Sequence, residues 1–196
     1  MFQIRVHGRG GQGVVTAAEM LSVAAFGQGK YALAFPSFGS ERMGAPVMAF
    51  CRISGQPIRS REPVVTPDAL IIQDPTLLHQ ADLFRGLAPH GFVLINSTRE
   101  FVDLGLQDLL DKLPAEHAFT VPAAEIARKH VGKPLPNAAL LGAFAAATQQ
   151  LRLESVLDAI RGRFSGRVGE ANVEAAKEAY AHILLCQREA VHAEAN

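Results

Sequence analysis

Residues 2–13 read FQIRVHGRGGQG, and this stretch decides the fold. Residues 2–6 have the composition of a strand, and a G-x-G-x-x-G pattern follows from Gly8 to Gly13. An Ala-rich apolar run at residues 14–26 then predicts a helix. A strand, a glycine loop and a helix in this order present bare backbone N–H groups at a helix N-terminus, where they favour an anion.

The rest of the chain continues this alternation. Short apolar runs predict strands at residues 30–35, 46–53, 69–72, 91–95 and 117–121. Helices are predicted at residues 76–85, 123–131, 138–151, 153–163 and 168–192. Pro75 can start the first of these helices and Asn137 can cap the third. The pattern predicts an α/β fold with a doubly wound, mostly parallel, Rossmann-like sheet, helices on both faces and a helical C-terminal part.

Composition narrows the class of protein. The 196 residues, of which 48% are hydrophobic, can form one domain with a real core. We expect that domain over residues 1–185, with a C-terminal tail at residues 186–196. Lys plus Arg and Asp plus Glu both number 19, so the net charge is zero and nothing favours nucleic acid or an anionic membrane. Zero charge also removes colloidal repulsion, which is a mild indication of a permanent partner.

The sequence contains few patterns that indicate targeting to a membrane or binding of a metal. The N-terminus lacks a secretory pattern and no apolar run reaches the roughly 20 residues of a membrane span, so we expect a cytoplasmic protein. Cys51 and Cys186 are far apart and form no C-x-x-C motif, so the chain offers no ligands for an iron–sulfur cluster or a Cys-based zinc site. We interpret both cysteines as small apolar residues, and we predict no metal site and no self-sufficient catalytic set.

The glycine loop can be interpreted in two ways, as a ligand-binding loop or as a structural turn. Its amides at Gly10, Gly11, Gln12 and Gly13 can hold the phosphate of a ligand, or the glycines serve only a tight turn and close packing. An NAD site also needs an acid at the end of the second strand, where this chain has residues 34–36, AFP. No G-K-[ST] closes the loop either. An ordinary nicotinamide dehydrogenase is therefore disfavoured.

A second loop, at residues 36–46, ends at the same predicted sheet edge. Its polar members are Ser37, Ser40, Glu41 and Arg42. Arg42 can pair with a carboxylate or a phosphate, and Glu41 can steady Arg9. The loop is either a solvated turn with an internal ion pair or a surface that meets a ligand or another subunit. The uncharged residues 43–46, MGAP, suit a protein interface.

Four more polar residues are predicted at strand ends on this edge. They are His7, Asp74, Asn96 and Ser97. We interpret His7 as a hydrogen-bonded structural histidine, Asp74 as a helix-start residue and the other two as turn residues. Arg161, Arg163 and Arg167 are interpreted as a solvated helix end.

Three motifs resemble a known family. The segment GRGGQGVV at residues 8–15 resembles the start of the gamma subunit of 2-oxoacid:ferredoxin oxidoreductases. PSFGSERMGAP at residues 36–46 resembles the family's second signature, where P-x-x-G-x-E-x-R-G-G is usual; this chain departs from it at residues 42–45, RMGA. PNAALLGA at residues 136–143 is similar to the third signature. The resemblance covers roughly residues 1–185.

The resemblance implies one subunit of a larger enzyme, not catalytic alone. Such an enzyme oxidatively decarboxylates a 2-oxoacid, forms an acyl-CoA and passes electrons to ferredoxin or, through a flavin subunit, to NAD. Thiamine diphosphate, with Mg, would lie between alpha-type and beta-type subunits. The [4Fe-4S] clusters would lie on the beta-type subunit and a ferredoxin-like delta subunit.

Within that enzyme the gamma subunit is expected to be structural and to face coenzyme A. The expected coenzyme A or interface contacts are Gly10, Gly11, Gln12, Gly13, Ser37, Ser40 and Arg42. Pyruvate, 2-oxoglutarate, branched-chain, indolepyruvate and phenylglyoxylate types remain open as substrates. The alternatives are a stand-alone Rossmann-type nucleotide-binding reductase and an accessory nucleotide-binding module without catalysis.

Overall fold

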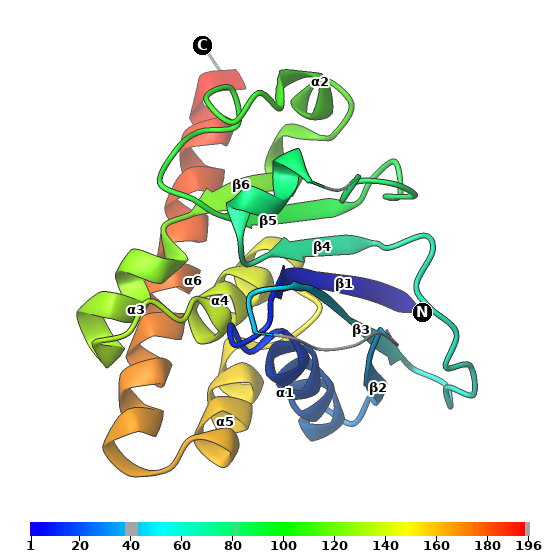
Figure 1. The fold of residues 1–196 in the computed structure, drawn as a ribbon, viewed down its shortest axis with the longest axis vertical. Helices are drawn as coiled ribbons and strands as arrows, with labels where there is room; N and C mark the ends of the chain where they lie inside the picture. The colour runs from blue at the N-terminus through cyan, green and yellow to red at the C-terminus, as the bar shows by residue number, and fades with distance from the viewer. Residues whose placement is uncertain (38–42, 81, 195–196) are drawn as a thin grey trace.

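The protein folds around a six-stranded sheet with the strand order β2-β3-β1-β4-β5-β6 (Figure 1). The structure is a computed structural model and describes residues 1–37, 43–80 and 82–194. The strands are β1 (Phe2–Arg9), β2 (Tyr31–Pro36), β3 (Pro46–Ser54), β4 (Ala69–Ile72), β5 (Phe92–Asn96) and β6 (Ala118–Val121). The α-helices are α1 (Val14–Gly27), α2 (Gln107–Leu110), α3 (Ala123–Val131), α4 (Asn137–Thr148), α5 (Leu153–Arg163) and α6 (Gly166–Glu194). Two short 3₁₀ helices are η1 (Pro75–His79) and η2 (Ala115–His117).

Most strands of the sheet run in one direction, as the sequence predicts. β4, β5 and β6 follow β1 in parallel register. β3 alone is reversed, and it pairs antiparallel with β1 and β2. Only residues 37–45 join β2 to β3, and such a short connection leads to antiparallel pairing. The sequence pattern of β3, a mostly apolar run, carries no information on strand direction.

The two faces of the sheet are covered differently. Ile4 and Val6 of β1 belong to a core shared with α1, α3, α4, α5 and α6, which all pack on one face. On the opposite face, Leu70 and Ile72 of β4 pack against η1, α2 and irregular segments. Helical elements therefore cover both faces, as predicted, but those on the second face are short. The reason is that the helix predicted at residues 76–85 forms only the single 3₁₀ turn of η1, so Leu77 and Leu83 reach the sheet from η1 and a loop.

The helical layer is tightest between α4 and α6. Every residue of α4 is buried. A Cβ on Gly142 would lie 2.0 Å from the carbonyl oxygen of Ala176 on α6, so only glycine allows this approach. The tight contact holds the first turn of α4 at the carboxyl edge of the sheet, close to the glycine loop. In the described part of the chain, no helix has the length and apolar character needed to cross a membrane.

Candidate functional site

The glycine loop links β1 to α1 at the carboxyl edge of the sheet. Gly11 and Gly13 have φ angles of 93° and 73°, a left-handed conformation that strongly favours glycine. Gly13 is the N-cap of α1, and no side chain caps this helix N-terminus. The first turn of α1 also contains no acidic residue. The helix therefore begins with a partial positive charge that its own side chains leave uncompensated.

Part of the predicted amide cradle is already used inside the chain. The N–H of Gly10 donates to the carbonyl of Ala45 (2.9 Å), and the N–H of Gln12 donates to the carbonyl of Arg9 (3.0 Å). Among the described residues, none accepts a hydrogen bond from the backbone N–H of Gly11 or Gly13. Within the described part of the chain, Gly11 and Gly13 are thus the members of the predicted set whose amides have no internal acceptor.

The second motif lies directly on the first. Gly44 donates its N–H to the carbonyl of Gly10 (3.2 Å), and the Cε atom of Met43 lies 2.9 Å from the position of a Cβ on Gly11. Met43 itself is 86% exposed. Ser37 anchors the other end of the loop by donating its N–H to the carbonyl of Met48 (2.8 Å). The predicted contacts Ser40 and Arg42, together with Glu41, lie outside the described residues.

The third motif completes the cluster. A Cβ on Gly13 would lie 2.7 Å from Nδ2 of Asn137, so the N-terminus of α4 touches the N-terminus of α1. Asn137 does not cap α4 as predicted, because Pro136 is the N-cap and Asn137 lies inside the first turn. Its Oδ1 accepts a hydrogen bond from the N–H of the next residue, Ala138 (2.9 Å). Three segments far apart in the sequence therefore meet at one sheet edge.

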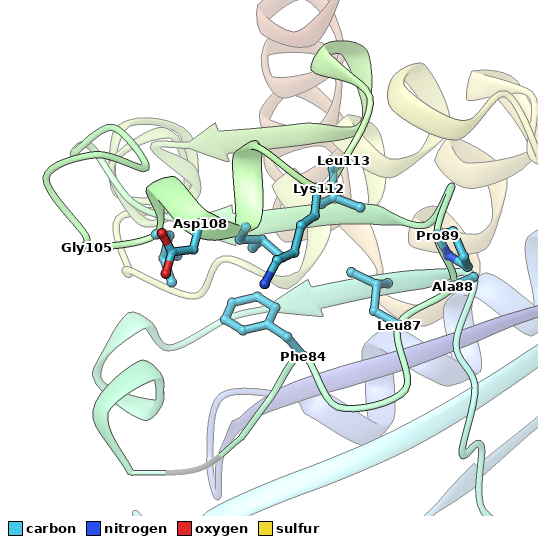
Figure 2. Close-up of a pocket in the computed structure, with 10 residues that line it drawn as sticks. Phe84, Leu87, Ala88, Pro89, Gly105, Asp108, Lys112 and Leu113 are labelled. Carbon is cyan, nitrogen blue, oxygen red and sulfur yellow. The ribbon is translucent and has the colours of Figure 1, made fainter.

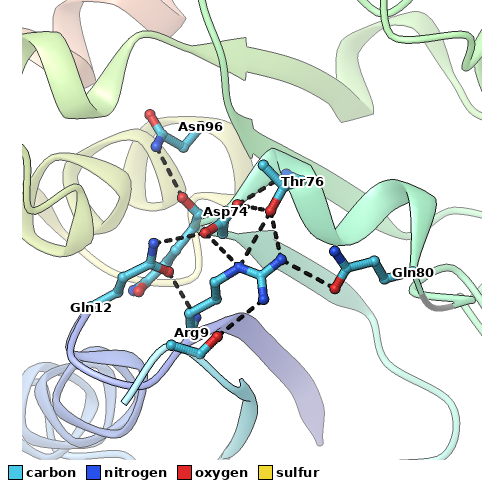
Figure 3. A network of polar contacts seen from close by, with 8 residues as sticks. Arg9, Gln12, Asp74, Thr76, Gln80 and Asn96 are labelled. Atoms are coloured by element: carbon cyan, nitrogen blue, oxygen red, sulfur yellow. Dashed lines mark hydrogen bonds and ion pairs between the residues drawn. The ribbon is translucent and has the colours of Figure 1, made fainter.

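A polar network joins this cluster to the end of β4 (Figure 3). Nε of Arg9 lies 3.2 Å from Oδ2 of Asp74, and the same oxygen accepts a hydrogen bond from Nε2 of Gln12 (2.9 Å). The Oε1 atom of Gln12 accepts from the N–H of Arg9 (2.7 Å). The Arg9 guanidinium also donates to the side chains of Thr76 and Gln80 and to the carbonyl of Gly44. Arg9 thus ties the glycine loop, the second motif and η1 together.

Asp74 stays ionised in this network. Burial alone would raise the pKa of its carboxyl group. Hydrogen bonds from Thr76 and Gln12, with the positive charge of Arg9, outweigh burial and lower that pKa below its usual value. Asp74 also accepts from the N–H of Thr76 (2.9 Å) at the start of η1, so its predicted helix-start role is confirmed. The crevice between β1 and β4, where open α/β sheets hold ligands, is bridged by the chain's own groups.

His7 and Asn96 also lie near this edge. Burial, with a smaller contribution from the charge of Arg5, lowers the pKa of His7 to about 4, so its ring is neutral at pH 7. Its Nε2 atom is buried without a hydrogen-bond partner, contrary to the expected hydrogen-bonded histidine. Asn96 donates to the carbonyl of Gln73 (2.9 Å) and accepts from the N–H of Ala124 in α3 (2.9 Å). Ser97 accepts from the N–H of Arg99 in a local turn, as predicted (2.9 Å).

Sequence reasoning missed Gln73. This residue is 1% exposed, and neither its Oε1 nor its Nε2 atom has a hydrogen-bond partner. Buried side-chain amides are nearly always hydrogen-bonded, so Gln73 is an exception. The only signal in the sequence is a polar residue that directly follows the apolar run of residues 69–72.

Cavities also lie outside the cluster of motifs, and two of them differ clearly in their lining. One, of about 530 Å³, opens between the segments around Phe84 and Leu113 on the face opposite the long helices (Figure 2). Apart from Asp108 and Lys112 its lining is uncharged and largely apolar, and it contains no motif residue. Another, of about 420 Å³, adjoins the polar network beyond Thr76 and is lined by Arg99 and Arg128. The second cavity gives ligand-sized space beside the network.

In the part of the chain that the structure describes, metal and cysteine chemistry indicate no alternative site. In the described ranges, no group of three or more His, Cys, Asp or Glu side chains is placed to hold a metal ion. Cys51 is fully buried, and burial raises the pKa of its thiol to about 12. Cys186 is half-buried on α6, and burial with the nearby charges of Glu189 and Glu100 raises its thiol pKa too. Both thiols are protonated at neutral pH, so neither is an activated nucleophile.

Comparison with known proteins gives one consistent answer. The sequence model of the family described as pyruvate ferredoxin/flavodoxin oxidoreductase matches residues 3–182. The common gamma subunit of the pyruvate/ketoisovalerate oxidoreductases of Pyrococcus furiosus is 46% identical over 180 residues, which are 92% of this chain and 96% of that subunit. The pyruvate synthase subunit PorC of Methanothermobacter marburgensis is 45% identical over 182 residues, with the same shares covered.

The solved structures agree. The pyruvate oxidoreductase subunit PORC of Thermotoga maritima superposes with a TM-score of 0.77 at 34% identity. The match covers 92% of this chain and 95% of that subunit. All three motifs lie within the matched residues, which are also those that converge at the carboxyl edge. This chain belongs to the pyruvate ferredoxin/flavodoxin oxidoreductase family, among its gamma subunits.

Proposed function

We propose that this chain works as the gamma subunit of a multi-subunit 2-oxoacid oxidoreductase that depends on thiamine diphosphate and iron–sulfur clusters. The complete enzyme would convert a 2-oxoacid to an acyl-CoA and pass electrons to ferredoxin or NAD. Family membership supports the subunit assignment, and the convergence of the three motifs at one edge is the observation that carries it.

The residues of this chain do not fit an iron–sulfur cluster. Two protonated cysteines, one buried and one on α6, are not a cluster-binding set. We therefore assign the clusters to beta-type and ferredoxin-like partners and, following the family resemblance, thiamine diphosphate to alpha-type and beta-type partners. When bound there, thiamine supplies the carbanion chemistry, and surrounding protein has to bind, orient and exclude water.

The role we propose for this chain is to supply a rigid, polar contact surface beside the coenzyme A route. Arg9 holds the glycine loop against η1 through Thr76 and Gln80. The amides of Gly11 and Gly13, which have no acceptor among the described residues, therefore have fixed directions. Met43 projects from the same place with 86% of its surface exposed, which suits an apolar anchor at a subunit interface. Fixed donors beside an exposed apolar side chain favour a contact completed by another chain or by coenzyme A.

A stand-alone nucleotide-binding reductase is the weaker proposal. β2 ends at Pro36 and offers no carboxylate for a ribose. The Arg9–Asp74 ion pair bridges the crevice in which a dinucleotide diphosphate would lie.

The test is turnover by the isolated chain and by the native assembly. Mild purification should bring larger, brown, cluster-bearing polypeptides with this chain, and that assembly should oxidise a 2-oxoacid in a coenzyme A-dependent reaction. The chain expressed alone should be colourless and inactive. A chain that alone reduces an acceptor at an ordinary enzymatic rate would refute the proposal, as would native purification without any companion polypeptide.

A further inference from the structure

The ends of three parallel strands lie in a row beneath the helices, and two of the three residues there carry side-chain amides. Gly8 of β1, Gln73 after β4 and Asn96 of β5 are neighbours, because β4 pairs in parallel with β1 and β5. All three positions face the long helices, since they continue the alternation of Val6, Ile71 and Leu94, which belong to the helix-facing core. The Cβ atom of Gln73 lies 3.2 Å from the position that a Cβ on Gly8 would take.

Three helix N-termini meet this row. α1 begins beside Gly8, where the Cγ2 atom of Val14 lies 2.7 Å from the same Cβ position. α4 begins at Asn137, in contact with Gly13. α3 donates the N–H of Ala124 to Asn96. Aligned N-termini bring partial positive charge to one place, and neither α1 nor α4 carries an acid in its first turn.

Gln73 lies where these helix N-termini meet, and its side-chain amide has no hydrogen-bond partner among the described residues. Both atoms of its amide are buried and unpartnered, although its backbone is satisfied by His7 and Asn96. The backbone N–H groups of Gly11 and Gly13 on the adjacent loop also lack partners among the described residues. Leaving the side-chain amide of Gln73 buried and unmatched opposes folding, so its retention indicates an occupant.

We propose that Gln73 and the N-termini of α1 and α4 form a binding site for one small oxyanion group, a phosphate or carboxylate of a small molecule. The Nε2 atom of Gln73, the amides of Gly11 and Gly13, and Nδ2 of Asn137 are the donors. Gln12, which contacts Gly8 and donates to Asp74, is the side chain that turns away to admit the group. This inference rests on the proposed function in that it names the ligand class of the same edge, but its test needs no partner subunit.

Phosphate titration of the full chain tests the site at constant ionic strength. The melting temperature should rise saturably, by about 5–10 °C at a hundred times the Kd. In ¹⁵N NMR spectra, inorganic phosphate should shift the side-chain amide of Gln73 and the backbone amides of Gly11 and Gly13. Acetate, as a carboxylate probe, should compete with phosphate for the same resonances.

Variants separate this site from general salt effects. Gln73→Met keeps the shape and removes the unpartnered amide, so it should melt at least as high as the wild type without phosphate and lose the saturable response. Gln73→Glu supplies an oxyanion from the chain itself and should also abolish the response. Asn172→Leu is the matched control, because Asn172 is a buried amide (5% exposed) that donates to the carbonyl of Val168 on α6. It should lower the melting temperature and keep the response.

The proposal is overturned if phosphate produces only a linear effect shared by all variants. It is also overturned if Gln73→Met lowers the melting temperature, which would mean that the amide is satisfied within the chain, or if the shifted resonances lie elsewhere. None of these results bears on the subunit assignment, which depends on assembly and turnover.

Discussion

The first turn of α4 and its middle meet the rest of the chain in opposite ways. At Gly142 the helix packs backbone to backbone on α6, with every neighbouring atom supplied by the chain itself. At Asn137 it joins a polar edge where the amide of Gln73 is unpartnered and the second motif leaves Met43 exposed. We call the α4–α6 packing at Gly142 the finished contact, because the chain itself supplies its neighbours. We call the carboxyl edge with Asn137, Gln73 and Met43 the unfinished edge, because it leaves polar groups unpartnered and an apolar side chain exposed. The α4–α6 layer holds the fold together, whereas the carboxyl edge is arranged for groups that come from outside the chain.

The largest effect should come from the finished contact. Gly142→Val should lower the free energy of unfolding by about 3–5 kcal/mol, because its side chain meets the backbone of α6 and cannot rotate away. Gly162→Val on α5 is the matched control, since a Cβ there has no atom within 4 Å. It should change stability by less than about 1 kcal/mol. Urea unfolding measures both. Equal losses at the two positions would mean that α4 and α6 are not in close backbone contact.

The sequence predicted the helices of the packed layer more accurately than the contacts at the unfinished edge. Apolar periodicity placed α3 and α5 with their observed bounds, and α1 and α4 to within three residues, because those patterns reflect burial on one face. The glycine spacing placed the strand–loop–helix unit at β1 and α1. The direction of β3 was not encoded in its apolar run, and the short η1 replaced a longer predicted helix.

The polar network was beyond sequence reasoning for a physical reason. Arg9 and Asp74 are 65 positions apart, and their pairing follows from β4 lying next to β1 in the sheet. Local pattern does not reveal strand order. For the same reason the sequence did not reveal that the side-chain amide of Gln73 is buried without partners. That property depends on the surrounding residues and not on the residue type. The contacts expected of Gly10, Gly11, Gln12, Gly13 and Ser37 with coenzyme A or a partner stay predictions.

A pH titration should give the next effect and should separate the two regions. The folded chain holds the pKa of His7 at about 4, below the value near 6.5 in an unfolded chain. The unfolded state therefore binds this proton first as the pH falls. Stability from this group is fully present above about pH 6.5 and is lost progressively down to about pH 4, by roughly 3 kcal/mol in all. The apolar α4–α6 contact has no such dependence.

His7→Leu isolates this contribution. Between pH 6.5 and 4.5 its free energy of unfolding should fall less steeply than that of the wild type, by up to about 1.4 kcal/mol per pH unit. The exposed His79→Gln variant should keep the wild-type slope. Identical slopes for wild type and His7→Leu would show that His7 is not a buried neutral group.

The smallest effect on the isolated chain should come from Met43, and it gives the most direct test of the unfinished edge. Met43→Glu and Val102→Glu both place a carboxylate on an exposed apolar position, 86% and 62% exposed in the wild type, and only Met43 lies on the glycine loop. Each should unfold within about 0.5 kcal/mol of the wild type. Assembly with the native partner subunits, measured by co-purification and analytical ultracentrifugation, should be weakened at least tenfold by Met43→Glu and unchanged by Val102→Glu. Full assembly of the Met43→Glu chain, with unchanged coenzyme A-dependent turnover, would contradict the account.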